Sequence, residues 1–424
     1  ADLHAGELER LLDASAAGGP ETLTEQQRQA IRAALTNKIS ILTGGPGTGK
    51  TTTLRTLIGV LERTRHRFLL ASPTGRAAKR LSEATGHPAR TIHRMLGFSP
   101  SAEGFGFTYN EDNPLDTDMV VVDEASMLDL HLFYNLLKAI NPDTHLLLVG
   151  DVDQLPSVGA GDVLNDMIHS GAGPVTRLDT IFRQAETSQI IRNAHRINKG
   201  ESPDTSNRGD DFFVFVEEDP QAAAELLVSI VQERIPAKFG LDPLADVQVL
   251  APMYRGPIGV SALNDVLQER LNPNEQGRKA ERRLMGTLFR VGDKVIQTRN
   301  NYEKDVFNGD IGQVYSFDMT DQVMTVMMDG RPVQYDWSEA DELTHAYCIS
   351  VHRAQGSEYP CVVMPVATQH YMMLQRNLLY TAVTRARQLV VLVGTRKAIA
   401  IAVRNDEVAR RWTALDWRIR DPTR

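Results

Sequence analysis

One glycine-rich loop restricts the possible folds of this chain more than any other feature of its sequence. The loop reads Gly44-Gly45-Pro46-Gly47-Thr48-Gly49-Lys50-Thr51, and it joins a predicted strand at Ile39–Leu42 to a predicted helix from about Thr51 to Arg63. Glycines allow backbone N–H groups to approach phosphate oxygens closely, and the amino terminus of a helix adds a partial positive charge. The pattern G-x-x-x-x-G-K-T between a strand and a helix therefore predicts a phosphate-binding loop in an α/β fold.

The residues of this loop have separate expected roles. Lys50 is expected to hold the β- and γ-phosphates of ATP, and the hydroxyl of Thr51 is expected to ligate Mg²⁺. The expected cofactors are therefore ATP and Mg²⁺. The loop residues expected to contact the nucleotide are Gly45, Gly47, Thr48, Gly49, Lys50, Thr51 and Thr52.

An acidic pair follows a second predicted strand, Met119–Val122. Asp123 at the strand end is expected to hold Mg²⁺, directly or through water, and Glu124 to orient and deprotonate the attacking water. The alternative is that the pair only caps the helix that follows. A third strand, His145–Val149, ends shortly before Gln154, whose amide could sense the γ-phosphate at the sheet edge where such folds bind ligands. The neighbouring aspartates are better explained as turn formers.

The order of strands and helices predicts two α/β domains, because 424 residues exceed what one core usually supports. Strands that alternate with amphipathic helices indicate mostly parallel sheets covered by helices. We expect an N-terminal helix (Leu3–Ala17) and linker within residues 1–22, a first domain at 23–200 and a second at 201–424. The expected strands after Leu42 are Phe68–Ala71, Met119–Val122, His145–Val149 and Val175–Leu178, then one near Phe212, Val247–Pro252, Cys361–Pro365 and Leu389–Gly394.

Two segments interrupt this alternation. Residues 98–117 are rich in glycine and asparagine around aromatic residues, which indicates a hairpin insertion. An irregular surface loop would explain the same composition nearly as well. Between Arg290 and Asp336, short strands alternate with turn pairs such as Asn308-Gly309 and Asp329-Gly330. This spacing predicts a small all-β insertion, plausibly a barrel, at about residues 285–340.

The net charge of -8 opposes nucleic-acid binding, but the local distribution of charge does not. The segment Arg76–Arg94 carries Arg76, Lys79, Arg80, Arg90 and Arg94 against the single acid Glu83, so a positive groove is possible in an acidic protein. No apolar stretch reaches about 18 residues and the start lacks a signal peptide, which predicts no membrane segment and a cytoplasmic protein. Cys348 and Cys361 lie in apolar strands and are expected to be buried reduced thiols, and no Cys/His spacing suits zinc.

Eight motifs in this order resemble those of superfamily 1 helicases, and most closely those of RecD-like helicases. They span Leu23 to Gly394 and are Leu23-Thr24-Glu25-Gln26-Gln27, the glycine-rich loop, Ala71-Ser72-Pro73-Thr74-Gly75-Arg76-Ala77-Ala78, Asp123-Glu124-Ala125-Ser126, Gly150-Asp151-Val152-Asp153-Gln154-Leu155-Pro156, Phe182-Arg183-Gln184, Ser350-Val351-His352-Arg353-Ala354-Gln355-Gly356-Ser357-Glu358 and Tyr380-Thr381-Ala382-Val383-Thr384-Arg385-Ala386. The resemblance implies an α/β fold of two RecA-like P-loop NTPase lobes with parallel sheets. It also implies a hairpin insertion in the first lobe and a small all-β (SH3-like) insertion in the second.

The same resemblance implies an ATP-dependent DNA helicase that moves 5′ to 3′ on single-stranded DNA. Its partners would be single-stranded DNA and single-strand/double-strand junctions, with repair or recombination proteins besides, and the chain itself could be a monomer. Gln27 would read the adenine edge, Gln154 would link the γ-phosphate to the DNA site, and Arg183 and Arg385 would act as arginine fingers from the inter-domain cleft. Gly356 and Glu358 would lie near the γ-phosphate and the ribose.

For DNA, the resemblance implies a groove along Pro73, Thr74, Arg76, Thr91, His93, His352 and Arg353 that follows the backbone without reading bases. His93 could equally be a helix-surface or capping histidine. The family usually has lysine where this chain has His352, and only about 20 residues precede the first motif, so we expect a truncated chain or a short relative. Two alternatives stay open: a motor subunit of a larger recombination complex, and a P-loop switch that does not translocate.

Overall fold

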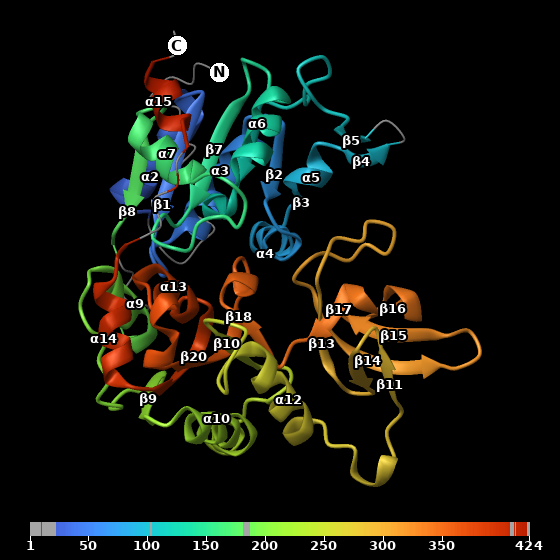
Figure 1. The fold of residues 1–424 in the computed structure, drawn as a ribbon. Coiled ribbons are helices and arrows are strands. Elements are labelled where there is room, and N and C mark those ends of the chain that lie inside the picture. Colours follow the sequence, from blue (N-terminus) through green and yellow to red (C-terminus); the bar gives the residue numbers. More distant parts are fainter. Residues whose placement is uncertain are drawn as a thin grey trace. The chain divides into compact units, whose positions relative to one another are not determined.

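The computed structural model describes residue 10 and residues 23–101, 104–180, 187–407, 411 and 413–421. It separates into two compact units: residues 1–187 with 409–424, and residues 188–408 (Figure 1). The division thus falls before residue 200, because α9 (Gln189–Asn198) packs on α13 (Arg376–Val383) of the second unit. The helix expected at Leu3–Ala17 lies outside the described residues, apart from Arg10.

The first unit contains a six-stranded sheet of order β3-β2-β6-β7-β1-β8, and every neighbouring pair is parallel. Its strands are β1 (Ile39–Gly44), β2 (Phe68–Ser72), β3 (Ala89–Thr91), β6 (Met119–Val122), β7 (His145–Gly150) and β8 (Val175–Leu178). Its helices are α2 (Glu25–Thr36), α3 (Lys50–Arg63), α4 (Gly75–Thr85), α5 (Ile92–Met95), α6 (Leu130–Lys138), α7 (Val163–Ser170) and α15 (Leu415–Arg420).

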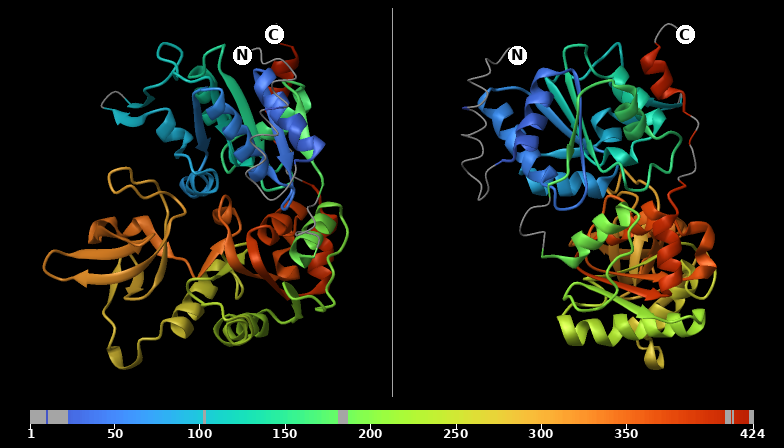
Figure 2. Two further views of the ribbon diagram at one scale, coloured as in Figure 1. Left: turned by 180° about the vertical axis from the view of Figure 1, so that it is seen from behind. Right: turned by 90° about the vertical axis from the view of Figure 1, so that its left-hand side faces the viewer.

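Alternate residues of the central strands supply two cores, one on each face of this sheet. Helices cover both faces (Figure 2). On β6, Val121 packs in the core beneath α2, α3 and α4, whereas Val120 and Val122 pack in the core beneath α5, α6 and α7. A strand buried on both faces reads as a continuous apolar run, as Met119–Val122 does. The predicted mostly parallel sheet covered by helices is therefore confirmed, and the helices lie on both of its faces.

A two-stranded hairpin extends from the first unit after α5. Its strands are β4 (Phe98–Ser101) and β5 (Gly104–Phe107), and Phe98 pairs with Phe107 in antiparallel register. Residues 108–118 contain no strand or helix until β6 begins. The segment expected to hold either a hairpin or an irregular loop contains both, one after the other.

The second unit contains a five-stranded parallel sheet of order β18-β10-β19-β20-β9. Its strands are β9 (Phe212–Val216), β10 (Val247–Ala251), β18 (Cys348–Ser350), β19 (Tyr359–Val366) and β20 (Ala386–Gly394). Around them lie α9, α10 (Pro220–Ser229), η2 (Ile230–Arg234), α11 (Ile235–Phe239), α12 (Val260–Leu271), η5 (His352–Ala354), η6 (Thr368–Met373), α13 and α14 (Arg396–Arg404). Both cysteines are free and buried in strands, as predicted.

The all-β insertion lies between α12 and β18. A five-stranded antiparallel sheet of order β16-β15-β14-β13-β17 is accompanied by a separate hairpin, β11-β12. The strands are β11 (Glu281–Leu284), β12 (Thr287–Arg290), β13 (Lys294–Gln297), β14 (Ile311–Asp318), β15 (Val323–Met328), β16 (Arg331–Asp336) and β17 (Leu343–His345), and the insertion also contains η3 (Glu275–Gly277) and η4 (Trp337–Glu342). It has its own apolar core, which includes Phe289, Met324 and Tyr335.

One buried carboxylate joins the insertion to the rest of the second unit. Asp293 is fully buried and accepts hydrogen bonds from the side chains around it. The donors include Gln268 Nε2 in α12 (2.6 Å), Asn272 Nδ2 at the C-cap of α12 (2.7 Å) and Tyr347 OH (2.8 Å). Burial alone would raise the pKa of Asp293, but the hydrogen bonds and the charge of His345 outweigh it, so the pKa is lowered. No helix of the described residues is both long and apolar enough to cross a membrane.

Candidate nucleotide and nucleic-acid sites

The carboxyl ends of three adjacent parallel strands bring the predicted nucleotide residues together. In the first unit β1 lies beside β7, and β7 lies beside β6. The glycine-rich loop follows β1, the Asp123-Glu124 pair follows β6, and the Asp151–Gln154 turn follows β7. Because the strands are parallel, all three segments lie at the same edge of the sheet.

The backbone of the glycine-rich loop takes conformations that favour glycine. Gly47 and Gly49 have φ values of 73° and 86°, in the left-handed region. At Gly44 a Cβ would lie 2.8 Å from Leu178 O and 2.8 Å from Thr48 Oγ1, so a side chain has no space there. Lys50 Nζ folds back over the loop, where it donates to the carbonyls of Gly44 and Gly45. Thr51 and Thr52 follow Lys50 in the first turn of α3.

Gln27 is anchored directly against this loop. The Gln27 side chain is fully buried and takes part in a capping box with Thr24 at the start of α2, in which Thr24 N donates to Gln27 Oε1 at 2.9 Å. Gln27 Nε2 donates to Gly49 O at 3.2 Å. The local cap therefore fixes the amide next to the loop that is predicted to bind phosphate.

The acidic pair carries both an unusual pKa and a strained backbone. Burial raises the pKa of Asp123 to about 6, the charge of Glu124 adds to the rise, and Lys50 and Arg80 oppose it. Glu124 has a φ of 54°, which is rare for a residue with a side chain and which occurs mostly at functional positions. Its carboxylate lies 3.7 Å from Arg80 Nη1 of α4. The side chain of Glu124 makes no cap hydrogen bond to η1 (Ala125–Met127), so the capping alternative does not hold for this residue.

Arg80 was named from the sequence only as one of the basic residues of the segment Arg76–Arg94, and it was not predicted to belong to the nucleotide site. Its position one helical turn after Arg76 was the only available signal, and such spacing is common on helix surfaces. Only the adjacency of β2, which precedes α4, and β6 brings Arg80 and Glu124 together. The pairing is thus a product of sheet order.

Gln154 is held in a compact turn after β7. Its side-chain Nε2 donates to Asp151 Oδ2 at 3.2 Å, and Asp151 is almost completely buried. Asp151 Oδ1 also accepts from Asp153 N, and Val152 N donates to Thr43 Oγ1 of β1 at 3.4 Å. Asp151 is therefore a turn former, as expected, and it also orients the amide of Gln154.

In the second unit, Arg385 lies at the end of α13, next to the segment that holds Gly356 and Glu358. Arg385 Nη1 donates to Ser357 O at 3.3 Å, and Tyr359 N donates to Arg385 O at 2.8 Å. Gly356 has a φ of 71°, and Glu358 forms an ion pair with Arg387 Nε at 2.8 Å. The structure thus gathers these three predicted residues in one place, whereas Arg183 lies outside the described residues.

The predicted DNA-contacting residues of the first unit follow the neighbouring strands β2 and β3. Pro73, Thr74 and Arg76 lie at the start of α4, and Thr91 and His93 lie at the start of α5. The two threonine hydroxyls cap these helices, accepting from Ala77 N at 3.3 Å and Arg94 N at 3.2 Å. In the second unit, His352 and Arg353 form η5, directly after β18.

His93 has a less favourable environment for phosphate than its neighbours. Its ring packs edge-on against Phe98, with centroids 5.5 Å apart, and lies 6.0 Å from Phe107, so it supports the base of the hairpin. Burial lowers the pKa of His93, which keeps the imidazole neutral near pH 7. His93 thus packs against the hairpin, a role that neither the DNA-contact prediction nor the helix-surface or capping alternative included.

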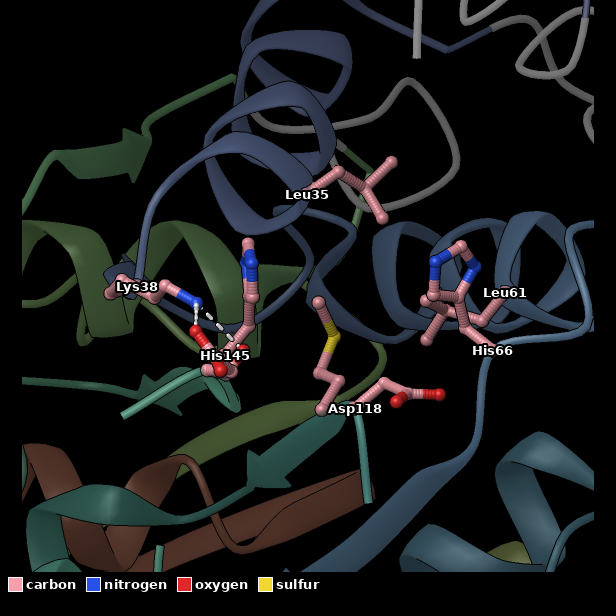
Figure 3. A pocket seen from close by; sticks show the side chains of 8 residues that line it. Leu35, Lys38, Leu61, His66, Asp118 and His145 are labelled. Atoms are coloured by element: carbon pink, nitrogen blue, oxygen red, sulfur yellow. Dashed lines mark hydrogen bonds and ion pairs between the residues drawn. The ribbon is translucent and has the colours of Figure 1, made fainter. Parts of the chain in front are cut away.

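A separate pocket lies at the opposite, amino-terminal edge of the same sheet (Figure 3). It encloses about 310 Å³ and is lined by Leu35, Lys38, Leu61, His66, Asp118, Met119, Asp143 and His145. Leu35 and Leu61 belong to the last turns of α2 and α3, and the other lining residues lie just before β1, β2, β6 and β7 or at the starts of β6 and β7. The pocket is therefore at the other end of the strands from the glycine-rich loop. Lys38 Nζ is bonded to Asp143 O at 2.7 Å. Within the described parts of the chain, no cluster of His, Cys, Asp and Glu has a metal-binding arrangement.

Three family models match separate parts of the chain. The model of an AAA domain matches residues 27–160, and that of a UvrD-like helicase C-terminal domain matches residues 345–393. The model of the SH3 domain of ATP-dependent RecD-like DNA helicases matches residues 263–328, a range that includes most of the all-β insertion. The matches thus include strands of both parallel sheets and most of the predicted SH3-like insertion.

Curated relatives match over almost the full chain. The ATP-dependent RecD2 DNA helicase of Deinococcus radiodurans is 39% identical over 94% of this chain, which spans 52% of that relative, or about half its length. The RecD subunit of the RecBCD enzyme of Mycolicibacterium smegmatis is 34% identical over 93% of this chain and 75% of the relative.

Solved structures with low sequence identity show the same fold. Pif1 from Bacteroides, solved with single-stranded DNA, is 19% identical, with a TM-score of 0.54 over 89% of this chain and 94% of the other. The Pif1 helicase of Candida albicans is 18% identical, with a TM-score of 0.51 over 89% and 98%. The fold of two RecA-like lobes is therefore confirmed.

Proposed function

This chain belongs to the RecD family of superfamily 1 helicases, and from that premise we propose that it is an ATP-dependent helicase that moves 5′ to 3′ on single-stranded DNA. The observation that carries the proposal is the shared sheet edge on which the glycine-rich loop, the Asp123-Glu124 pair and Gln154 meet. This arrangement supplies phosphate donors after β1, an acid pair after β6 and an amide after β7. Because DNA and ATP are the substrates, we propose that the protein acts in the cytoplasm.

In the proposed reaction, each residue has a defined role. Lys50 binds the β- and γ-phosphates, the amides of the glycine-rich loop bind the remaining phosphate oxygens, and Gln27 contacts the adenine edge. Glu124 accepts a proton from the attacking water, and the nearby Arg80 orients its carboxylate. Gln154 senses the γ-phosphate. Arg183 and Arg385 supply guanidinium charge to the transferred phosphoryl group, on which negative charge spreads in the transition state.

The residues also fit a Mg²⁺ ion. Thr51 and Asp123 offer hydroxyl and carboxylate oxygens, which are the ligands this hard cation prefers. Burial and the neighbouring charge of Glu124 raise the pKa of the partly exposed Asp123, and a bound cation would oppose both effects. When bound, Mg²⁺ neutralises part of the phosphate charge.

For the DNA strand, we propose contacts from Pro73, Thr74, Arg76, Thr91, His352 and Arg353, with His93 acting mainly through packing. Hydroxyls, backbone amides and cations suit phosphates and do not distinguish bases, as a motor that accepts any sequence requires. ATP binding and hydrolysis would shift the two lobes between states that differ in affinity for the strand.

Unwinding of short tailed duplexes tests this proposal. Duplexes carrying a 5′ or a 3′ single-stranded tail are incubated with ATP and the protein, and Lys50→Ala serves as the matched control. We expect unwinding from the 5′ tail alone and none with Lys50→Ala. Unwinding from the 3′ tail alone would reject the direction of movement, and equal activity of Lys50→Ala would reject the nucleotide site.

A second function is favoured by one comparison. The relative from Mycolicibacterium smegmatis is named as a subunit of the RecBCD enzyme, so this chain could be the motor subunit of a larger recombination complex. Size-exclusion chromatography of the isolated protein, combined with unwinding by the same fractions, separates the two. Unwinding that coelutes with the monomer supports an independent helicase, whereas a monomer without unwinding activity supports the subunit.

A further inference from the structure

The end of the chain folds back onto the first unit. Residues 411 and 413–421, here called the C-terminal arm, include α15, which packs on α7 (Figure 1). Leu415 and Ile419 of α15 pack against the core beneath α6 and α7. Thr413 Oγ1 donates to the carboxylate of Asp166 in α7. The arm is therefore part of the first unit, although the whole second unit precedes it in the sequence.

Arg411 of the arm binds the loop at residues 157–161 of the first unit. Arg411 Nη1 donates to Gly159 O at 2.6 Å and to Gly161 O at 2.9 Å, and it lies 3.4 Å from Ser157 Oγ. Ser157 Oγ donates to Gly159 O at 3.0 Å, so the loop at residues 157–161 already turns on itself. A guanidinium that bridges two carbonyls holds this turn closed, because its planar donors fix direction as well as distance.

This loop begins three positions after Gln154, with little freedom between them. Leu155 is buried, and the ring of Pro156 fixes its φ. On its other side the loop packs on the start of α6, where Leu130 N donates to Ala160 O at 2.8 Å and a Cβ at Gly159 would lie 2.5 Å from Asp129 Oδ2. If the loop moves, Gln154 should therefore move with it, because the two residues between them allow little change in the backbone.

We propose that Arg411 is a positioning residue for Gln154, so that the C-terminal arm sets the rate of the hydrolytic step. The inference rests on the proposed function, because it assigns Gln154 to the γ-phosphate. Arg411 itself contacts loop carbonyls and acts by holding the loop that follows Gln154. Its loss would let the loop sample more conformations, and the amide of Gln154 would spend less time in its productive position.

Single-turnover ATP hydrolysis with saturating oligo(dT) tests the proposal on the full chain. Arg411→Ala is expected to lower the hydrolysis rate constant about tenfold, short of the ~100-fold that a 1 Å misplacement can cause. The KM for ATP should change less than about twofold, because interactions made only in the transition state act on kcat. Arg411→Lys, which keeps a cationic donor, should recover part of the rate. Arg418→Ala, at an exposed position in α15 of the same arm, should match the unaltered chain.

A double variant distinguishes positioning from general loosening of the fold. If Arg411 acts through Gln154, Gln154→Ala/Arg411→Ala hydrolyses ATP no more slowly than Gln154→Ala alone. If the second substitution slows Gln154→Ala by its full factor, Arg411 acts independently and the proposal is overturned. An unchanged rate in Arg411→Ala overturns it as well.

Hydrogen exchange gives a readout that does not depend on activity. In Arg411→Ala, amides of residues 152–161 should exchange at least about threefold faster than in Arg418→Ala, while amides of β1 and β6 should not change. Unchanged exchange in residues 152–161 would overturn the positioning role even if hydrolysis is slower. Failure of the proposed function appears differently, as absent hydrolysis in the unaltered chain or full hydrolysis in Lys50→Ala.

Discussion

Replacing Asp293 with asparagine tests how firmly the all-β insertion is joined to the second unit. Asp293 Oδ1 accepts from Asn272 and Tyr347, and Oδ2 accepts from Gln268 and from Arg290 N at 2.8 Å. In Asp293→Asn one of these oxygens becomes an NH₂ group, so at least two buried donors lose their acceptor. At about 1–3 kcal/mol for each buried unsatisfied group, the loss in free energy of unfolding is roughly 2–6 kcal/mol.

The fluorescence of Trp337 provides the assay, because this residue packs against the apolar core of the insertion. Replacing Trp412 and Trp417 with phenylalanine leaves Trp337 as the single tryptophan of the chain, which has three. Urea unfolding then reports on the insertion. Asp341→Asn is the matched control, since this carboxylate is 44% exposed and pairs with Arg299 at 3.2 Å, and it should lose less than about 1 kcal/mol.

The pH dependence has a definite sign. The pKa of Asp293 is lowered in the folded protein, so its contribution to stability is present above the unfolded pKa of about 3.9 and is lost as the pH falls through the lower folded value. The difference between the unaltered chain and Asp293→Asn should therefore shrink below about pH 4. A loss under about 1 kcal/mol at pH 7 would refute the reasoning, because it would mean that the donors find other acceptors.

Three further substitutions probe the nucleotide site. If Arg385 is an arginine finger as proposed, Arg385→Ala should leave ATP binding intact while DNA-stimulated turnover falls about 10³-fold, and near-normal turnover would remove Arg385 from the site. Gln27→Ala should reduce the preference for ATP over GTP about tenfold in competition binding, equivalent to about one hydrogen bond, whereas Gln26→Ala should keep it. Gly44→Ala should weaken nucleotide binding, because its Cβ would lie 2.8 Å from Leu178 O, and unchanged affinity by titration calorimetry would show that the loop adjusts.

The strands and the nucleotide loop could be predicted from sequence because their signals are local. The apolar run Met119–Val122 matches β6 residue for residue. The helix after the loop was predicted from about Thr51, and in the structure it begins one residue earlier, at Lys50. Both signals come from residues that are adjacent in the chain. A strand buried on both faces is a continuous apolar run, and glycines allow the backbone to turn before the helix begins. Residue spacing alone therefore located these elements.

Other parts of the site depend on sheet order and on distant segments. The pairing of Arg80 with Glu124 requires that β2 lie beside β6, and no pattern around either residue shows this. The interaction of Arg411 with the loop at residues 157–161 joins positions about 250 residues apart. Helix α15 of the same arm has only six residues, which is too short for a helical period to be recognised, so its docking on α7 could not be read from the sequence.

The return of the chain to the first unit also bears on how the protein is made. Because residues 409–424 belong to the first unit, a ribosome must complete residues 188–408 before the α7 surface can receive Leu415 and Ile419. The nascent first unit would therefore wait with an apolar surface uncovered while the second unit is synthesised, at about 5–20 residues per second. A gene fragment that ends near residue 187 would leave that surface uncovered permanently, whereas one in which residues 411–421 are joined to it by a flexible linker could cover it.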